Sequence, residues 1–274
     1  MRARGPIGIE DLIDRGGARL VQRVQRDGAA IEVYEDHRYR WLQNDNGTLQ
    51  SLMDRRSPER LVLPYTAAMM AGLLFVDGPP TVLMLGLGGA SQVRFLRRHF
   101  ADTRITAWES DPDVIAIARR HFCLSSEDEA ICIINEDARH GIAADGSSTN
   151  LILMDLFGAD GSPPWVHEKA IHESCRRRLG RHGVLVANFW LEDDDESLAA
   201  MDGIQSAFEN RTLVLGVPGY RNHIVFAFKD APCLNFTALY TRAASLGKHT
   251  GIDYTGFISR MRESNPSGES EFEF

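Results

Sequence analysis

A glycine-rich segment is the first candidate for chemistry in this chain. Residues 83–91 read Leu-Met-Leu-Gly-Leu-Gly-Gly-Ala-Ser, which is typical of a strand that turns sharply into a helix. Glycine is required where the backbone takes a positive φ or lies against a nucleotide-type ligand, so Gly86 and Gly88 are candidate ligand-binding residues. A tight turn without a ligand is the alternative, because Ser91 occupies the place of the third glycine of a dinucleotide-binding motif.

Three carboxylates follow later apolar runs, at Glu109, Asp137 and Asp155. An acid that ends the second strand of a nucleotide-binding sheet accepts hydrogen bonds from ribose hydroxyls, and Glu109 has this position. An acid after the third strand suits an adenosyl group, because a carboxylate accepts a hydrogen bond from the adenine amino group. We assign this role to Asp137, with Glu136 as its rival.

Asp155 comes directly after the apolar run Asn150–Met154. It is therefore expected at the carboxyl edge of a sheet, where open α/β sheets bind their ligands. The glycine turn, Glu109 and Asp137 would reach the same edge. Together these positions predict one crevice that binds a nucleoside-containing ligand.

The elements that would position these residues alternate between strands and helices. Apolar runs predict strands at Thr81–Leu85, Arg104–Trp108, Ala130–Ile134, Asn150–Met154, Val184–Asn188, Thr212–Leu215 and His223–Phe228. Helical stretches are predicted near Gln92–Phe100, Pro112–Phe122, Trp165–Leu179 and Glu196–Phe208. This alternation predicts a parallel sheet covered on both faces, except that Gly216–Asn222 is too short for a crossover helix, so the last two strands should pair antiparallel. The fold class is therefore α/β, with the Rossmann-like sheet of S-adenosylmethionine-dependent transferases: seven strands, mostly parallel, one antiparallel.

A different periodicity precedes this region. From Ala30 to Leu52 apolar and polar residues alternate, and the turn sequence Asn44-Asp45-Asn46-Gly47 interrupts them, which predicts strands joined by tight turns. We therefore divide the chain into an N-terminal β-element (1–62), a Rossmann-like catalytic domain (63–262) and a flexible acidic tail (263–274).

Composition narrows the class of protein. The 274 residues include 30 Lys and Arg against 38 Asp and Glu, a net charge of −8, and 43% are apolar. This is typical of a folded enzyme, and the acidic balance disfavours nucleic acid as a partner.

The expected location is the cytoplasm, with no contact to a membrane. The longest apolar run, Ala67–Val76, is too short for a membrane span and fits a buried helix. Acidic residues interrupt the N-terminal region where a signal peptide would be apolar. The four cysteines lack Cys-x-x-Cys spacing, and His167 and His172 have no evident third ligand, so we expect reduced thiols and no metal site.

On these motifs the chain resembles the spermidine synthase family, the polyamine aminopropyltransferases, as a divergent member. The resemblance spans about residues 30–228. It includes Gly47–Gln50, the glycine turn, Trp108–Asp111, Glu136–Ala138 and the strand leading into Asp155.

The resemblance implies a role for each matching residue. Gln50 and Glu109 would hold the ribose, and Asp137 with Ala138 the adenine. Asp155 would orient the attacking amine and take its proton, while Tyr65 and Tyr220 are candidate substrate-binding residues.

The implied reaction moves an aminopropyl group from decarboxylated S-adenosylmethionine to a small amine such as putrescine and releases methylthioadenosine. No metal is needed, because a sulfonium is already a good leaving group. A homodimer is expected from the resemblance alone.

Three departures from the family pattern leave other functions open. Gly89 replaces the aspartate of the glycine motif, Gly158 replaces the second acid after Asp155, and Thr66-Ala67 replaces a His-Glu pair after Tyr65. An aspartate at position 89 would repel the carboxylate of ordinary S-adenosylmethionine, whereas Gly89 does not. The alternatives are a small-molecule methyltransferase that uses S-adenosylmethionine and a non-catalytic nucleoside-binding relative.

Overall fold

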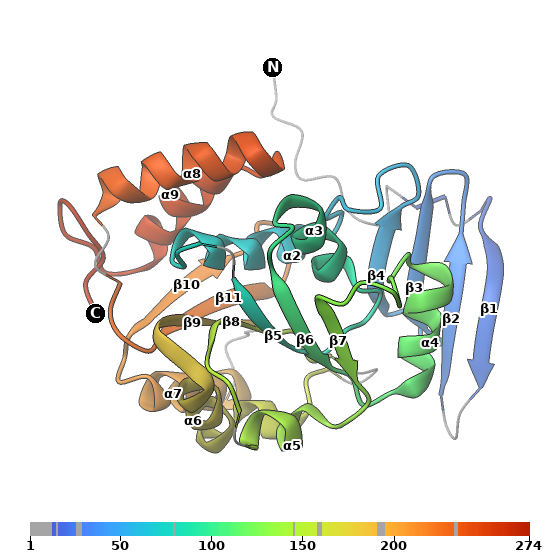
Figure 1. Cartoon of the computed structure of the whole chain (residues 1–274), viewed down its shortest axis with the longest axis horizontal. Helices are drawn as coiled ribbons and strands as arrows, with labels where there is room; N and C mark the ends of the chain where they lie inside the picture. Colours follow the sequence, from blue (N-terminus) through green and yellow to red (C-terminus); the bar gives the residue numbers. More distant parts are fainter. Residues whose placement is uncertain are drawn as a thin grey trace.

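Two β-sheets and a set of covering helices make up the described molecule (Figure 1). The computed structural model describes residues 13–14, 16–25, 29–78, 80–144, 146–157, 161–190, 195–232 and 235–274, with only the backbone at 195–196. Gly158, the acidic stretch 192–194 and Cys233 lie outside these residues.

The N-terminal sheet is a meander of four antiparallel strands, β1 (Arg19–Gln25), β2 (Ala30–Glu35), β3 (Tyr39–Asn44) and β4 (Leu49–Asp54), paired in chain order. The alternation of the sequence predicted the last three of these strands. Gly47 has a φ of +84° and its amide donates to the carbonyl of Asn44, which confirms the predicted Asn-Gly turn. The sheet packs an apolar face on helix α4 (Pro112–His121).

The larger sheet has seven strands in the order β10-β11-β9-β8-β5-β6-β7. Their bounds are β5 (Thr81–Leu85), β6 (Arg104–Trp108), β7 (Ile131–Ile134), β8 (Thr149–Met154), β9 (Leu179–Trp190), β10 (Thr212–Gly216) and β11 (Asn222–Phe228). Strand β11 runs antiparallel to both β9 and β10, and the other pairings are parallel. The predicted fold class is therefore confirmed.

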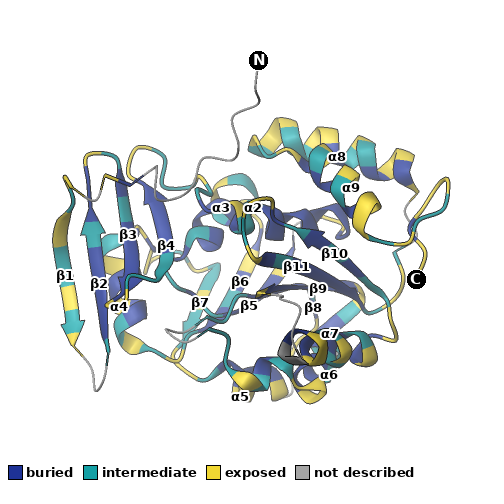
Figure 2. Cartoon of the chain, turned by 180° about the vertical axis from the view of Figure 1, so that it is seen from behind, coloured by how far each residue is buried: buried dark blue, intermediate teal, exposed yellow. Residues whose placement is uncertain are grey.

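Side chains alternate between the two faces of this sheet, so each face has its own core. One face is covered by α2 (Pro64–Met69), the 3-10 helix η1 (Met70–Leu74), α3 (Ser91–His99), α8 (Phe236–Thr250) and α9 (Tyr254–Ser264). The other face is covered by α5 (Ala138–Ala143), the 3-10 helix η2 (Pro164–His167), α6 (Lys169–Arg178) and α7 (Asp195–Ala207). Figure 2 shows the resulting pattern, with dark-blue strands between helices whose outer sides are exposed.

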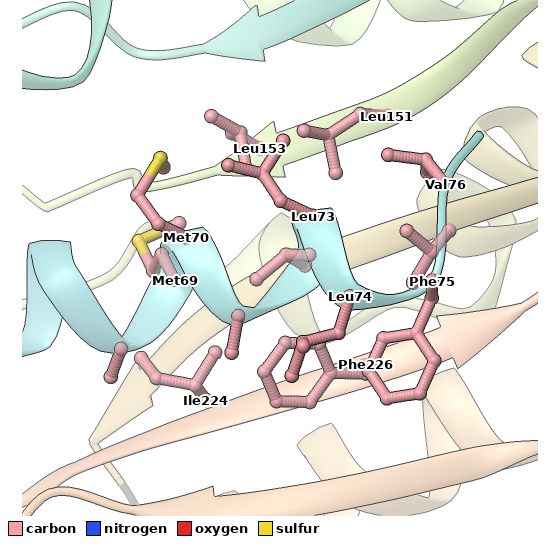
Figure 3. Close-up of a cluster of buried hydrophobic side chains, with 14 of the residues drawn as sticks. Met69, Met70, Leu73, Leu74, Phe75, Val76, Leu151, Leu153, Ile224 and Phe226 are labelled. Carbon is pink, nitrogen blue, oxygen red and sulfur yellow. The ribbon is translucent and has the colours of Figure 1, made fainter. Parts of the chain in front are cut away.

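The segment around η1 is the buried helix that the apolar run Ala67–Val76 predicted. Its side chains, including Leu73 and Phe75, lie between Leu151 of β8 and Phe226 of β11 (Figure 3). A Cβ on Gly72 would lie 2.6 Å from the side chain of Val186, so the helix contacts the sheet at van der Waals distance.

Strand β9 extends beyond the predicted Val184–Asn188 at both ends. Two further differences from the prediction have physical reasons. The predicted helix Trp165–Leu179 is divided into η2 and α6, because Glu168 adopts an extended conformation (ψ 134°) between them. The acidic tail packs in part on α8: Phe272 is buried against Phe236, whose amide donates to the carbonyl of Ser270. Its Ser, Glu and Gly content does not predict this contact.

Candidate active site

A cavity of about 520 Å³ opens at the carboxyl edge of the seven-stranded sheet, and residues of both sheets line it. All nine predicted site residues lie on its wall: Gln50, Tyr65, Gly86, Gly88, Glu109, Asp137, Ala138, Asp155 and Tyr220. The structure therefore brings together positions that are far apart in the sequence. Their individual roles stay predictions.

The glycine turn joins two parts of the cavity through backbone contact. Gly86 has a φ of +94°, and a Cβ at this position would lie 2.4 Å from the carbonyl oxygen of Asp155. Gly88 also has a positive φ, of +51°. Gly86 is thus required both for its backbone conformation and for the close approach of the chain that follows β8.

Glu109 follows β6 and lines the cavity, and each of its carboxylate oxygens accepts a hydrogen bond from a backbone amide. Oε2 accepts from the amide of Leu87 at 3.1 Å, and Oε1 accepts from the amide of Asp111 at 3.0 Å. Burial raises the pKa of Glu109, and these hydrogen bonds oppose the rise. No described residue forms an ion pair with this carboxylate. The amide of Gly88 also hydrogen-bonds to this carboxylate. Its two oxygens provide about four acceptor positions, so the three amides leave room for a ribose hydroxyl.

Asp137 caps the N-terminus of α5 and lines the cavity, whereas its rival Glu136 is exposed and does not. An ion pair with Arg139, at 2.7 Å, lowers the pKa of Asp137. The guanidinium of Arg139 also stacks over the ring of Trp165, 5.1 Å from its centroid. The sequence did not predict this pairing, which leaves Asp137 ionised and still able to accept a further hydrogen bond.

Asp155 is held by neutral partners. Its Oδ1 accepts from Nδ2 of Asn188 at 2.9 Å, and Asn188 in turn accepts from Nδ2 of Asn222 at 3.0 Å. The hydroxyl of Tyr65 also hydrogen-bonds to the carboxylate. Burial raises the pKa of Asp155 to about 6, against the hydrogen bonds from Asn188 and Tyr65. A carboxylate of this pKa is ionised at neutral pH and is a stronger base than an ordinary aspartate.

Aromatic side chains surround the part of the cavity near Asp155. The rings of Phe157 and Trp190 lie 5.0 Å apart, and Trp190 is 45% exposed although it lines the wall. Tyr65 and Tyr220 line the same cavity. Such rings stabilise ammonium and sulfonium groups through their π faces.

The N-terminal sheet contributes an amide pair, of which sequence reasoning predicted Gln50 and missed Asn44. Nε2 of Gln50 donates to Oδ1 of Asn44 at 3.0 Å, which leaves Oε1 of Gln50 to accept from a ligand. Nδ2 of Asn44 is buried on the cavity wall and has no hydrogen-bond partner among the described residues. Asn44 belongs to the turn sequence that predicted the hairpin, and that role concealed its place in the site.

Gly89, which replaces the aspartate of the family motif, is closely packed. Its amide donates to Oγ of Ser51 at 2.7 Å, and a Cβ here would lie 2.8 Å from Cβ of Ser51 and 3.1 Å from the ring of Phe122. A longer side chain would require β4 to shift. Gly89 is therefore in close contact with the N-terminal sheet.

Asn188 and Asn222 were also missed, although both lie at the cavity edge of their strands. Position at a strand end was the signal that identified the acids, and it applies equally to these two amides. Among the described residues no group of three or more His, Cys, Asp or Glu side chains is placed to bind a metal ion. In that same part of the chain, no helix is both long and apolar enough to cross a membrane.

Comparison with known proteins identifies relatives of this chain. No family model matches the chain. A polyamine aminopropyltransferase of Neisseria meningitidis is 34% identical over 244 residues, which cover 88% of this chain and 92% of that protein. One from Chromobacterium violaceum is 33% identical over 236 residues, covering 86% and 90%.

This chain belongs to the polyamine aminopropyltransferase family. Its fold is that of two solved structures with lower identity. A probable spermidine synthase from Corynebacterium glutamicum has a TM-score of 0.70 at 19% identity and covers 93% of this chain and 99% of its own. Human methyltransferase-like protein 13 in complex with SAH has a TM-score of 0.61 at 22% identity, covering 75% and 94%.

Membership in the aminopropyltransferase family confirms the resemblance drawn from the motifs. It supports an aminopropyltransferase activity for this chain. Of the departures from the family pattern, Thr66 lines the cavity, whereas Gly89 is buried next to Gly88 and does not line it. Thr66 is buried and its hydroxyl donates to the carbonyl of Leu63, so it serves the start of α2.

Proposed function

We propose that this protein transfers an aminopropyl group from decarboxylated S-adenosylmethionine to a small amine and releases methylthioadenosine. One observation carries the proposal. Asp155 lies on the wall of a nucleoside-sized cavity, is held only by neutral hydrogen-bond donors among the described residues, and has a pKa raised to about 6. The family relatives named polyamine aminopropyltransferase support it.

In this proposal the donor and the acceptor amine occupy different parts of the cavity. Glu109 and Gln50 would hold the ribose, and Asp137 with Ala138 the adenine, so that the sulfonium reaches the glycine turn. The amine nitrogen attacks the methylene carbon next to the sulfonium, the carbon–sulfur bond breaks, and methylthioadenosine leaves without charge. Asp155 accepts the proton that the nitrogen loses. Most of the acceleration comes from alignment of the two substrates.

The test is to incubate the protein with decarboxylated S-adenosylmethionine and putrescine and to identify the nucleoside product by chromatography. We expect methylthioadenosine in equal amount to the alkylated amine. A panel of monoamines and longer polyamines then identifies the acceptor. Absence of methylthioadenosine with every amine would contradict the proposal.

Methyl transfer is a second candidate, and the packing of Gly89 against Ser51 favours it. No acid of the described chain occupies this position, so nothing there repels the carboxylate of S-adenosylmethionine. A mouse eEF1A lysine and N-terminal methyltransferase is 27% identical over 61% of this chain. The same assay with S-adenosylmethionine distinguishes the two reactions, because methyl transfer releases S-adenosylhomocysteine and aminopropyl transfer does not.

Assembly and location remain part of this proposal. We propose a homodimer that acts in the cytoplasm on small amines, without a metal ion. Size-exclusion chromatography with light scattering tests whether the protein is a homodimer. Activity after exhaustive treatment with EDTA tests whether the reaction needs a metal ion.

A further inference from the structure

A chain of side-chain amides connects three neighbouring strands at the cavity edge. Nδ2 of Asn222 donates to Oδ1 of Asn188 at 3.0 Å, and Nδ2 of Asn188 donates to Oδ1 of Asp155 at 2.9 Å. Asn188 and Asn222 are 2% and 7% exposed. The connection runs from β11 through β9 to the residue after β8, and it crosses the sheet perpendicular to the strands.

The unusual direction of β11 makes this connection possible. Parallel strands bring only their carboxyl ends to this edge of the sheet, whereas antiparallel β11 brings its first residue, Asn222. Register places Asn222 opposite Trp190 and Ile224 opposite Asn188, so the two asparagines are diagonal neighbours on one face. Met154 pairs with Ala187, and Asp155 therefore follows in line with Asn188.

The direction of the hydrogen bonds is the important property. A carboxamide has donors on one side and an acceptor on the other. Because Asn222 donates to Oδ1 of Asn188, the amide of Asn188 is left with its Nδ2 facing Asp155. If Asn188 were reversed, its oxygen would face a carboxylate, and both groups would lose their hydrogen bond.

We propose that Asn222 is a positioning residue, which acts through Asn188 to hold the carboxylate of Asp155 in the orientation that receives the acceptor amine. The inference rests on the proposed function, since it concerns the same proton acceptor. Asn222 itself touches neither substrate in this scheme. It selects the orientation of Asn188, and Asn188 donates to the ionised form of Asp155.

Few other groups face Asp155, so the pH at which Asp155 titrates is sensitive to its hydrogen bond from Asn188. Tyr65 hydrogen-bonds to it from α2, and Tyr220 lines the cavity from the turn between β10 and β11. Glu109, after β6, is an acid on the same wall, and after β5 the contact is the glycine backbone at Gly86. No described Lys, Arg or His forms an ion pair with Asp155.

The test uses three variants of one side chain. Asn222→Asp keeps the shape but replaces the donor by an acceptor, Asn222→Leu removes the donor, and Asn222→Ser keeps a donor on a smaller side chain. We would follow the carboxyl of Asp155 by NMR in protein carrying ¹³C-labelled aspartate, with the signal assigned by its loss in Asp155→Asn. This measurement needs no turnover.

We expect the titration midpoint of Asp155 to rise by about one pH unit in Asn222→Asp, a tenfold change in the ionised fraction below the midpoint. In Asn222→Leu we expect about half a unit, or threefold, and in Asn222→Ser a value near that of the unchanged protein. The matched control is Asn265→Leu. Asn265 bonds to the backbone of Val214 on the same sheet and lies outside the cavity wall, so its loss should destabilise without moving the midpoint.

The acid limb of kcat/KM should move in parallel with the NMR midpoint. Absence of turnover with any donor would contradict the proposed function and leave the titration to decide this inference. An unchanged midpoint in folded Asn222→Asp and Asn222→Leu would overturn the inference. A midpoint in Asn222→Ser equal to that of Asn222→Leu would overturn it as well, because packing and not donation would then be responsible.

Discussion

Buried carboxylates of the two sheets differ in what surrounds them. In the N-terminal sheet, Glu35 contacts three arginines, Arg19, Arg40 and Arg55. Burial alone would raise the pKa of Glu35, but hydrogen bonds from Arg40 and Arg19 outweigh it and lower the pKa to about 2. Asp54 of the same sheet pairs with Arg38 at 3.0 Å, and its pKa is also lowered.

At the edge of the seven-stranded sheet the balance is reversed. Burial raises the pKa of both Glu109 and Asp155, and the groups that oppose the rise are backbone amides, an asparagine and a tyrosine. These two acids form no ion pair among the described residues. Only Asp137 resembles the N-terminal acids, through Arg139.

The two regions therefore differ in whether the protein itself provides a cation next to its buried carboxylates. The N-terminal sheet supplies its own cations, so its carboxylates stabilise the fold. The cavity provides no such cation for Glu109 or Asp155, so these two carboxylates are stabilised further only when a ligand brings positive charge. A sulfonium donor and an ammonium acceptor meet this requirement, whereas an anionic ligand does not.

The largest effect is expected for Asp155→Asn. Removing the proton acceptor should lower kcat/KM by about 100- to 10,000-fold, while donor affinity stays within a few-fold. Because the pKa of Asp155 is raised in the folded protein, its ionisation costs stability as pH rises from about 4 to about 6. Urea denaturation should therefore show that the variant loses this part of the pH dependence. Unchanged turnover would remove Asp155 from the mechanism.

The second prediction breaks the N-terminal arrangement. Arg40→Met leaves Glu35 with fewer partners in a buried site and should lower the free energy of unfolding by about 2 kcal/mol, since two other arginines remain. The pKa of Glu35 is lowered, so its contribution is complete above about 4.5 and is lost as pH falls toward about 2. Arg19→Met is the control, because the Arg19 side chain is 75% exposed and should contribute less than 1 kcal/mol. Equal losses in both variants would contradict the prediction.

The third prediction compares one acid from each region. Glu109→Gln should weaken binding of the donor about tenfold, because it replaces a charged hydrogen-bond acceptor for ribose hydroxyls. Stability should change little, because removal of a buried charge without a cation is offset by an amide NH2 that cannot accept from the backbone amide it faces. Glu35→Gln should do the opposite, with lower stability and unchanged affinity. Isothermal calorimetry measures the donor affinity and thermal melting the stability of each variant. The same change in affinity and in stability for Glu109→Gln and Glu35→Gln would refute the difference between the two regions.

The smallest effect is expected for Asn44→Val. The unpartnered Nδ2 of Asn44 costs stability in the free protein, so the substitution should not destabilise. Loss of its contact with Gln50 frees the Gln50 amide to rotate, and donor affinity should fall about threefold. Equal affinity in Asn44→Val and the unchanged protein would show that this amide pair does not contact the donor.

Most of the fold could be predicted from periodicity. Thr81–Leu85 and Arg104–Trp108 match β5 and β6 at both ends, because buried parallel strands are short apolar runs bounded by turns. Helices α5, α8 and α9 and strand β1 were not predicted. Strand β1 is an exposed edge, and its mixed pattern of Arg, Gln and Val has no clear period.

The acidic residues of the site could be predicted from the sequence, whereas the asparagines could not. Glu109, Asp137 and Asp155 stand out as acids after apolar runs, so their convergence could be anticipated. Asn188 follows an equally apolar run, but a neutral side chain gives no such signal. The arginine beside Asp137 also required the structure, since only the turn into α5 brings Arg139 back onto its cap.

The contact between Gly86 and the backbone of Asp155 has a consequence for how this cavity can change. In the proposed reaction the glycine turn would meet the donor and Asp155 the acceptor, and the two segments are in main-chain contact: a Cβ on Gly86 would lie 2.4 Å from the carbonyl oxygen of Asp155. The span between the two substrates is therefore built into the framework, and substitutions in the lining can alter which molecules bind without altering how far apart they react. Acceptors can be exchanged on such a framework while the geometry of displacement is kept. Gly86 is the position at which any side chain would lengthen that span.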